Sequence, residues 1–259
     1  MEAAAKKYHI SVLLDMSKSS AFVLTSALEL AKQIDGALEV FHVNPYNTRN
    51  GKRSSMTKDY DSSQAQIKEL IINMGKQEHL PVTYKMEHGR VKHRIRDYLA
   101  LHRPDILVLG KRRPRFGIFS ESITDFVINQ TSHTNVLILG EDDKFHTFKD
   151  INLVFFGNEL KASNLEVIKD LTRNSEKPVR HFDISQDQPQ KTEFPWHKTV
   201  SYKFSKGVNA LDGLVNYVSH TNIQLLCVPK KAGKRIMLKN NPIKAIIRKT
   251  KVPLLILPK

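Results

Sequence analysis

Residues His88 to Arg113 read HGRVKHRIRDYLALHRPDILVLGKRR, and the fold class follows from this pattern. Gly89 leads into Val91 to Leu101, which we predict as a helix. The apolar run DILVL, Asp105 to Leu109, comes next and ends at a glycine, which is typical of a short strand buried on both faces. A helix that leads into a buried strand indicates an α/β fold with a parallel sheet and right-handed crossovers.

The rest of the first half repeats this alternation. Strands are predicted at His9–Asp15, Ala37–Val43, Pro81–Glu87 and Asn135–Leu139, and helices at Phe22–Ile34, Gln64–Lys76 and Ser122–Gln130. Asn44 to Ser63 is polar and is predicted as a loop. These elements make residues 1–143 the first of two domains, each with a five-stranded parallel sheet.

The second half starts the pattern again and forms the second predicted domain, residues 150–259. Strands are predicted at Ile151–Phe156, Val179–Ile184, Thr199–Phe204, Ile223–Val228 and Pro253–Leu257, and helices at Asn164–Thr172 and Ala210–Val218. Pairing Asp15 with Gly157 gives an offset of 142, whereas pairing Asn135 with Pro253 gives 118, so the second copy is 24 residues shorter. The loss falls near Gln186 to Trp196, where two prolines and no helical period indicate a missing crossover helix.

Composition excludes several classes of protein. Cys227 is the single cysteine, so an intramolecular disulfide and a cysteine-cluster metal site are excluded. No apolar run approaches the roughly 18 to 20 residues of a membrane span. The sequence enters a predicted strand directly after its first lysines, without a separate apolar leader. We therefore expect a cytoplasmic globular protein that does not contact membranes.

Positive charge is concentrated in the C-terminal part of the chain. The sequence has 41 Lys and Arg against 26 Asp and Glu, a formal net charge of +15. Ser201 to Lys259 contains 12 of these cations and one acid, Asp212. Such asymmetry suggests a face that meets an acidic partner or a polyanion, and the alternative is a solvated basic surface that binds nothing specific.

Several motifs in the first half occur in the order and spacing of a known family. They are LLD ending at Asp15, a serine-rich turn, FHV ending at Val43, the segment from His88 to Arg113, and NVLIL. In these features the chain resembles the universal stress protein family, well over residues 7–140 and weakly over 150–259. The resemblance implies a tandem pair of flavodoxin-like, or adenine nucleotide α-hydrolase-like, domains.

Nucleotide-binding members of that family carry a loop G-x-x-G-x9-G-[ST] after the fourth strand. By resemblance, the candidate nucleotide-binding residues are Asp15, Val43, Gly110, Arg112, Arg113 and Ser122. The loop departs from the pattern, because Arg113 takes the second glycine position and Glu121 precedes Ser122. It is also two residues shorter than the family pattern.

These departures favour a degenerate site that binds no ATP and needs no cofactor. Glu121 would set a carboxylate beside a triphosphate, and like charges about 4 Å apart cost ~1 to 4 kcal/mol. Lys111, Arg112, Arg113 and Arg115 could instead hold an altered anion by charge and bidentate hydrogen bonds. The alternative is a stress switch that binds ATP or another adenine nucleotide in the first domain. In the second copy, Gly157 and Pro229 are expected in place of Asp15 and Gly110.

No residue pattern indicates catalysis. His88 and His93 are five apart, but no third metal ligand is indicated. We therefore predict a non-enzymatic binding or regulatory protein of the stress response. Asn135–Leu139 and Pro253–Leu257 are predicted to pair antiparallel within the chain, giving an internal pseudo-dimer. Polyanion binding by the basic C-terminal half is a third hypothesis.

Overall fold

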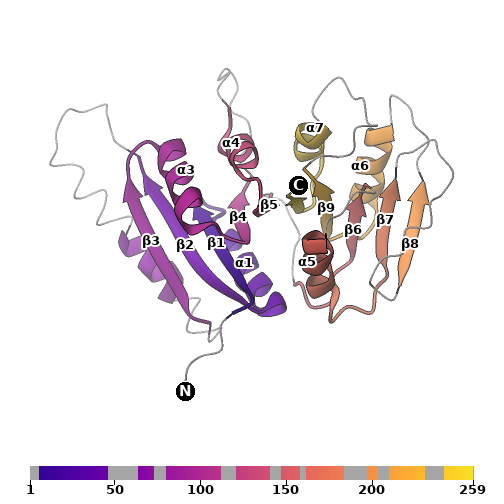
Figure 1. Cartoon of the computed structure of the whole chain (residues 1–259), viewed down its shortest axis with the longest axis horizontal. Helices are drawn as coiled ribbons and strands as arrows, with labels where there is room; N and C mark the ends of the chain where they lie inside the picture. Colours follow the sequence, from indigo (N-terminus) through magenta and orange to yellow (C-terminus); the bar gives the residue numbers. More distant parts are fainter. Residues whose placement is uncertain are drawn as a thin grey trace. The chain divides into compact units, whose positions relative to one another are not determined.

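The computed structural model describes residues 6–45, 64–72, 80–111, 121–140, 147–157, 162–183, 198–203, 210–230 and 242–258. The chain divides into two compact units, Met1–Thr134 and Asn135–Lys259. Both units combine helices with a mainly parallel sheet (Figure 1), which confirms the predicted α/β class. Within the described residues, no helix combines the length and apolar character that crossing a lipid bilayer requires.

Unit 1 alternates strands and helices as expected. Its elements are β1 (Tyr8–Leu14), α1 (Ser20–Ile34), β2 (Gly36–Asn44), a helix at 64–72, β3 (Val82–His88), α3 (Val91–His102), β4 (Ile106–Gly110) and α4 (Ile123–Gln130). The four strands lie in the order β3-β2-β1-β4 and all run parallel. Figure 1 shows α3 and α1 on opposite faces of this sheet. The central strands are therefore covered on both sides, which explains their unbroken apolar runs.

Unit 2 contains β5 (Asn135–Leu139), β6 (Leu153–Phe156), α5 (Ala162–Thr172), β7 (Val179–Asp183), β8 (Thr199–Lys203), α6 (Ala210–His220), β9 (Leu225–Pro229), α7 (Pro242–Lys249) and β10 (Leu254–Leu257). Five of its strands run parallel in the order β8-β7-β6-β9-β10, so β8-β7-β6-β9 repeats the order β3-β2-β1-β4 of unit 1. The stretch 186–196, where a crossover helix was expected to be missing, lies outside the described residues.

The strand β5 pairs with β10 in antiparallel orientation. Leu137 lies opposite Leu255, with Ile138 opposite Leu254 and Val136 opposite Ile256. This pairing explains why β5 belongs to the second compact unit although it follows α4 in the chain. The predicted domain limits, 1–143 and 150–259, stay a prediction.

Strand register corrects the sequence alignment of the two halves by one residue. Gly110 ends β4 and Pro229 ends β9, so Ile106 corresponds to Leu225. Ile10 lies opposite Ile106, and Leu153 lies opposite Leu225, so Ile10 corresponds to Leu153 and not to Asn152. The residues just before these strands correspond in the same way, His9 to Asn152 and Asp105 to Gln224. The His9 N–H donates to the Asp105 carboxylate at 2.8 Å, and the Asn152 N–H donates to the Gln224 amide oxygen at 2.9 Å.

The counterpart of Asp15 is therefore Asn158, which lies outside the described residues. Gly157, which was expected there, takes the place of Leu14. The alignment slipped by one because the ends of the two runs, Val12–Leu14 and Leu153–Phe156, are continuously apolar, so no alternation of polar residues marks the register there.

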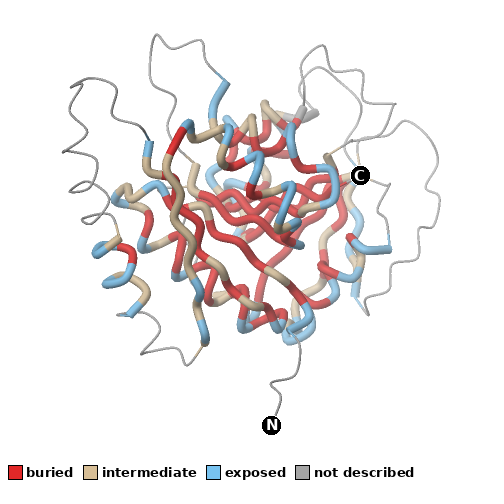
Figure 2. Tube along the Cα trace, turned by 60° about the vertical axis from the view of Figure 1, so that its left-hand side comes forward, coloured by how far each residue is buried: buried red, intermediate tan, exposed pale blue. Residues whose placement is uncertain are grey.

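Buried residues concentrate in the strands and on the inward faces of the helices (Figure 2). In unit 1, Ile10, Val12, Val40 and Ile106 are fully buried, and in unit 2 Val154, Phe155 and Leu226 are too. Cys227 is also fully buried, and burial raises the pKa of its thiol. A protonated thiol inside an apolar strand acts as a small hydrophobic side chain.

A polar contact fixes α3 to the sheet of unit 1. Tyr98 stacks on Phe41 of β2 with ring centroids 4.0 Å apart. Its hydroxyl lies 2.7 Å from the buried Ser11 hydroxyl and donates a hydrogen bond to the Glu39 carboxylate. Burial and the bond to Glu39 raise the pKa of Tyr98 far above its ordinary value. The tyrosine therefore stays protonated and serves as a donor to a half-buried carboxylate.

Candidate functional site

The candidate site lies at the carboxyl edge of the unit 1 sheet. The chain moves from β1 outward to β2 and β3 and then returns to β4 on the other side of β1. The connections that follow β1 and β4 therefore leave toward opposite faces. In open α/β sheets, ligands bind at the carboxyl ends of the strands at such a switch point. Asp15 follows β1 and Gly110 ends β4, so both lie there.

Asp15 is exposed and shapes the turn from β1 into α1. Its Oδ1 atom accepts the Ser17 N–H at 2.9 Å and the Ser20 hydroxyl at 3.4 Å. Met16 adopts φ 56°, and the hydroxyls of Ser17 and Ser19 lie 2.9 Å apart. One carboxylate and three hydroxyl groups thus gather where α1 begins. This cluster offers both donors and an acceptor to a polar ligand.

His42 on β2 is a neighbour that sequence analysis did not single out, although it lies in the FHV motif. Its side chain is buried, and its Nδ1 atom lies 2.8 Å from the Leu14 carbonyl oxygen, so Nδ1–H is the donor. Burial lowers the pKa of His42. The Leu14 bond and the Asp15 carboxylate act in the opposite direction, and His88 adds to the lowering. The His42 imidazole is therefore neutral, and it lies close enough to the Asp15 carboxylate to feel its charge.

We expect the lowered pKa of His42 to make the protein less stable in mild acid. The unfolded chain gains a proton near the ordinary histidine value of 6.5 while folded His42 stays neutral, so the free energy of unfolding falls as the pH drops below that value. Urea titrations between neutral and mildly acidic pH measure this slope. His42→Gln should reduce it, whereas His133→Gln, at an exposed position, should not. An equal slope in both variants would show that His42 is not responsible.

Packing against α1 favours a glycine at position 110. A Cβ atom there would lie 3.2 Å from Cγ2 of Val23 and 3.6 Å from Oγ of Ser19. Both neighbours belong to the start of α1, and Val23 is buried. The glycine therefore lets β4 approach α1 closely. This contact accounts for Gly110 without any phosphate.

Ser122 begins α4, and the residues around it are acidic. Its hydroxyl oxygen accepts the Asp125 N–H at 3.0 Å, as an N-cap does. The Glu121 carboxylate accepts a bond from Lys92 at 3.2 Å and from the Asn129 amide at 2.8 Å. The carboxylates of Glu121 and Asp125 therefore lie at the positive end of this helix, which is the end at which helices bind anions.

The remaining predicted residues contribute unequally. Val43 is only 8% exposed, so its side chain belongs to the core. Arg112 and Arg113 lie outside the described residues, while Lys111 is described and half-buried. The structure thus brings Asp15 and Gly110 together at the switch point. In the described part of the chain, no three His, Cys, Asp or Glu side chains are placed to hold a metal ion.

The corresponding edge of unit 2 differs in its backbone donors. Pro229 ends β9 in the place of Gly110 and has no N–H to offer. A Cβ atom on Gly157, which has φ +98°, would lie 3.3 Å from Cγ of Pro229. The next N–H, that of Lys230, donates to the Leu257 carbonyl at 2.8 Å. The rest of that loop lies outside the described residues.

Comparison with known families identifies the family of the chain. The family model described as the Universal stress protein family matches residues 8–139, about half of the chain. The chain belongs to the universal stress protein family. A comparison with curated proteins finds no match.

Solved structures of universal stress proteins share the fold over almost the whole chain. A universal stress protein from Archaeoglobus fulgidus DSM 4304 has 11% sequence identity and a TM-score of 0.76, over 98% of this chain and 97% of that one. A putative universal stress protein from Pseudomonas aeruginosa UCBPP-PA14 has 10% identity and a TM-score of 0.59, over 97% and 93%. At these identities the likeness is one of fold, and it includes unit 2.

Proposed function

We propose that this universal stress protein is a non-enzymatic, cytoplasmic binding or regulatory protein of the stress response, with a degenerate nucleotide site. The observation that carries the proposal is the bond between Glu121 and Lys92 at 3.2 Å. Lys92 is a cation near the start of α4, but its charge is offset by Glu121, which replaces a glycine of the family pattern. A triphosphate would have to displace that carboxylate or lie beside it.

Calorimetry of the full chain with magnesium and ATP tests this proposal. We expect no binding heat at millimolar nucleotide, and no adenine nucleotide in an acid extract of the purified protein. Glu121→Gly removes the carboxylate and releases Lys92, so it should improve any residual binding. Clear heat from the unmodified chain that Asp15→Ala abolishes would overturn the proposal and establish the alternative, a nucleotide-responsive switch.

The pairing of β5 with β10 supports a second part of the proposal, an internal pseudo-dimer of two diverged universal stress protein domains. Closing two strand edges on each other removes unpaired backbone groups that would otherwise recruit other chains. In this proposal the second half is a copy that has lost its phosphate-binding backbone at Pro229.

The basic C-terminal half is proposed as a surface for an acidic partner. Arg248, Lys249 and Lys251 are exposed at the end of α7, and Lys249 forms an ion pair with Asp212. Cations at a helix carboxyl end also stabilise the helix itself. Affinity for an acidic partner that falls steeply with salt would favour binding over this purely stabilising role.

A further inference from the structure

One arginine and two tyrosines form a cluster between the sheet and α6 in unit 2. Arg180 lies on β7, Tyr202 on β8 and Tyr217 on α6. The ring centroids of the two tyrosines are 5.6 Å apart, and each ring meets Phe182 edge-on, at 5.1 and 5.2 Å. Phe182 is fully buried, whereas the other three side chains are half-buried. The cluster therefore rests on a buried ring and is partly open to solvent.

The same place in unit 1 is occupied by a carboxylate. Glu39 lies opposite Ser11 on β1, and Arg180 lies opposite Val154, the counterpart of Ser11. Tyr98 and Tyr217 each precede the first residue of the next strand by eight positions. The tyrosine is thus present in both units, while its charged partner changes from an anion to a cation.

The surroundings of that charge differ as well. In unit 1, Glu39 lies 3.8 Å from His102, and Lys85 lies 3.2 Å from the same imidazole, so charges of both signs are close together. In unit 2, Tyr202 takes the place of Lys85, because it lies opposite Phe182 as Lys85 lies opposite Phe41. Within the described residues, no carboxylate forms an ion pair with Arg180.

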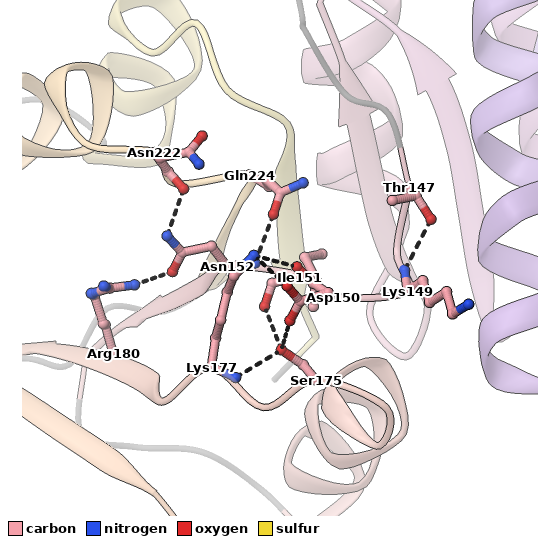
Figure 3. Close-up of polar contacts among 10 residues, drawn as sticks. All are labelled: Thr147, Lys149, Asp150, Ile151, Asn152, Ser175, Lys177, Arg180, Asn222 and Gln224. Carbon is pink, nitrogen blue, oxygen red and sulfur yellow. Dashed lines mark hydrogen bonds and ion pairs between the residues drawn. The ribbon is translucent and has the colours of Figure 1, made fainter.

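Arg180 is held in position by an anchored amide (Figure 3). Its Nη1 donates to the Asn152 side-chain oxygen. The Asn152 amide nitrogen donates to the Asn222 carbonyl at 2.5 Å, and its backbone N–H donates to Gln224 at 2.9 Å. Asn152, which is itself fixed by Asn222 and Gln224, therefore orients the guanidinium through Nη1. The other N–H groups of Arg180 can donate to the tyrosines and to a ligand.

The two hydroxyl groups converge on the same guanidinium. Hydrogen bonds from Tyr217 and Arg180 lower the pKa of Tyr202, and the bond to Tyr202 raises the pKa of Tyr217. A guanidinium and two phenols thus present several donors and one full positive charge in a small, partly open space. A tetrahedral oxyanion satisfies such a set of donors.

We propose that Arg180, Tyr202 and Tyr217 bind a phosphoryl group, either free phosphate or a phosphorylated side chain. The site lies in unit 2 and does not involve the carboxyl edge that contains Asp15. It is therefore independent of the proposed loss of nucleotide binding in unit 1.

Nuclear magnetic resonance of the full chain with ¹³C-labelled tyrosine rings tests this site. Inorganic phosphate is added at constant ionic strength, with chloride as the matched anion. We expect saturable shifts of the Tyr202 and Tyr217 signals, assigned through Tyr202→Phe and Tyr217→Phe, and no shift of Tyr98. A phosphoserine peptide is titrated in parallel. Tighter binding of the peptide identifies a phosphoprotein as the source, and equal binding identifies free phosphate.

Arginine variants complete the test. Arg180→Gln should weaken phosphate binding about tenfold or more, because charged hydrogen bonds are lost. Arg96→Gln removes the same charge at an exposed position on α3 and should change nothing. If Arg180→Gln does not fold, Tyr202→Phe should still weaken binding several-fold. No saturable shift, or equal shifts in the Arg180 and Arg96 variants, would overturn the proposal.

Discussion

Replacing Leu137 and Leu255 together with Asp is expected to break the pairing of β5 with β10 and to expose Cys227. The two leucines lie opposite each other and are 1% and 2% exposed. Two carboxylates in this position would repel each other and lose their hydration. We therefore expect a loss of about 4 kcal/mol or more in the free energy of unfolding. Cys227 lies opposite Leu255 on β9, so its thiol becomes accessible when β10 leaves.

The reaction rate of the single cysteine with a soluble disulfide reagent measures this opening. Small-angle scattering gives the radius of gyration of the same samples, which should increase if the halves form a pseudo-dimer through these strands. Leu101→Asp is the matched control, because Leu101 is 74% exposed on α3. A double variant with intact helix signal, an unreactive thiol and an unchanged radius would contradict the pairing.

Tyr98→Phe is expected to lower the free energy of unfolding by about 2 to 3 kcal/mol. The variant keeps the ring that stacks on Phe41 but removes the hydroxyl between Ser11 and Glu39. Ser11 is fully buried and Glu39 is half-buried, so the loss leaves polar groups without this partner. Such unsatisfied groups cost about 1 to 3 kcal/mol each, more when one is charged.

Urea titration of the Tyr98→Phe variant gives this value, and Tyr217→Phe, in the partly open cluster of unit 2, should cost less. In a Glu39→Gln background the effect of Tyr98→Phe should shrink, because the two groups interact directly. The raised pKa of Tyr98 adds a pH signature. Above the ordinary value of 10.0 the unfolded chain loses its proton first, so stability falls there. An unchanged alkaline slope in the variant would contradict this assignment.

The strands were predictable because their sequence signal is local. DILVL, HISVLL and NVLIL are short apolar runs between polar turns, and each becomes a strand buried in a sheet. The helix predicted at Val91–Leu101 is found at Val91–His102. For the helix predicted at Gln64–Lys76, the structure describes residues 64–72 as helical.

The candidate site was predictable only in part. Asp15, Gly110 and Ser122 stand at element ends that periodicity marks, so their places could be inferred. The bonds of Glu121 with Lys92 and Asn129 were not visible in the sequence, because Lys92 comes from a different helix. The role of His42 was missed because a buried histidine and an exposed one look alike in a single sequence.

Local composition alone thus determined the α/β class, the order of the elements other than α7 (Pro242–Lys249), which was not predicted, and the acidic residue beside Ser122. Tertiary structure decided the register of β6, the charged partner of Tyr98 in unit 1 and of Tyr217 in unit 2, and the bond from Arg180 to Asn152. Hydrophobic runs specify which segments are buried, but one residue of slip leaves such runs equally apolar. Only the hydrogen-bonded pairing of strands distant in sequence determines which polar side chains meet.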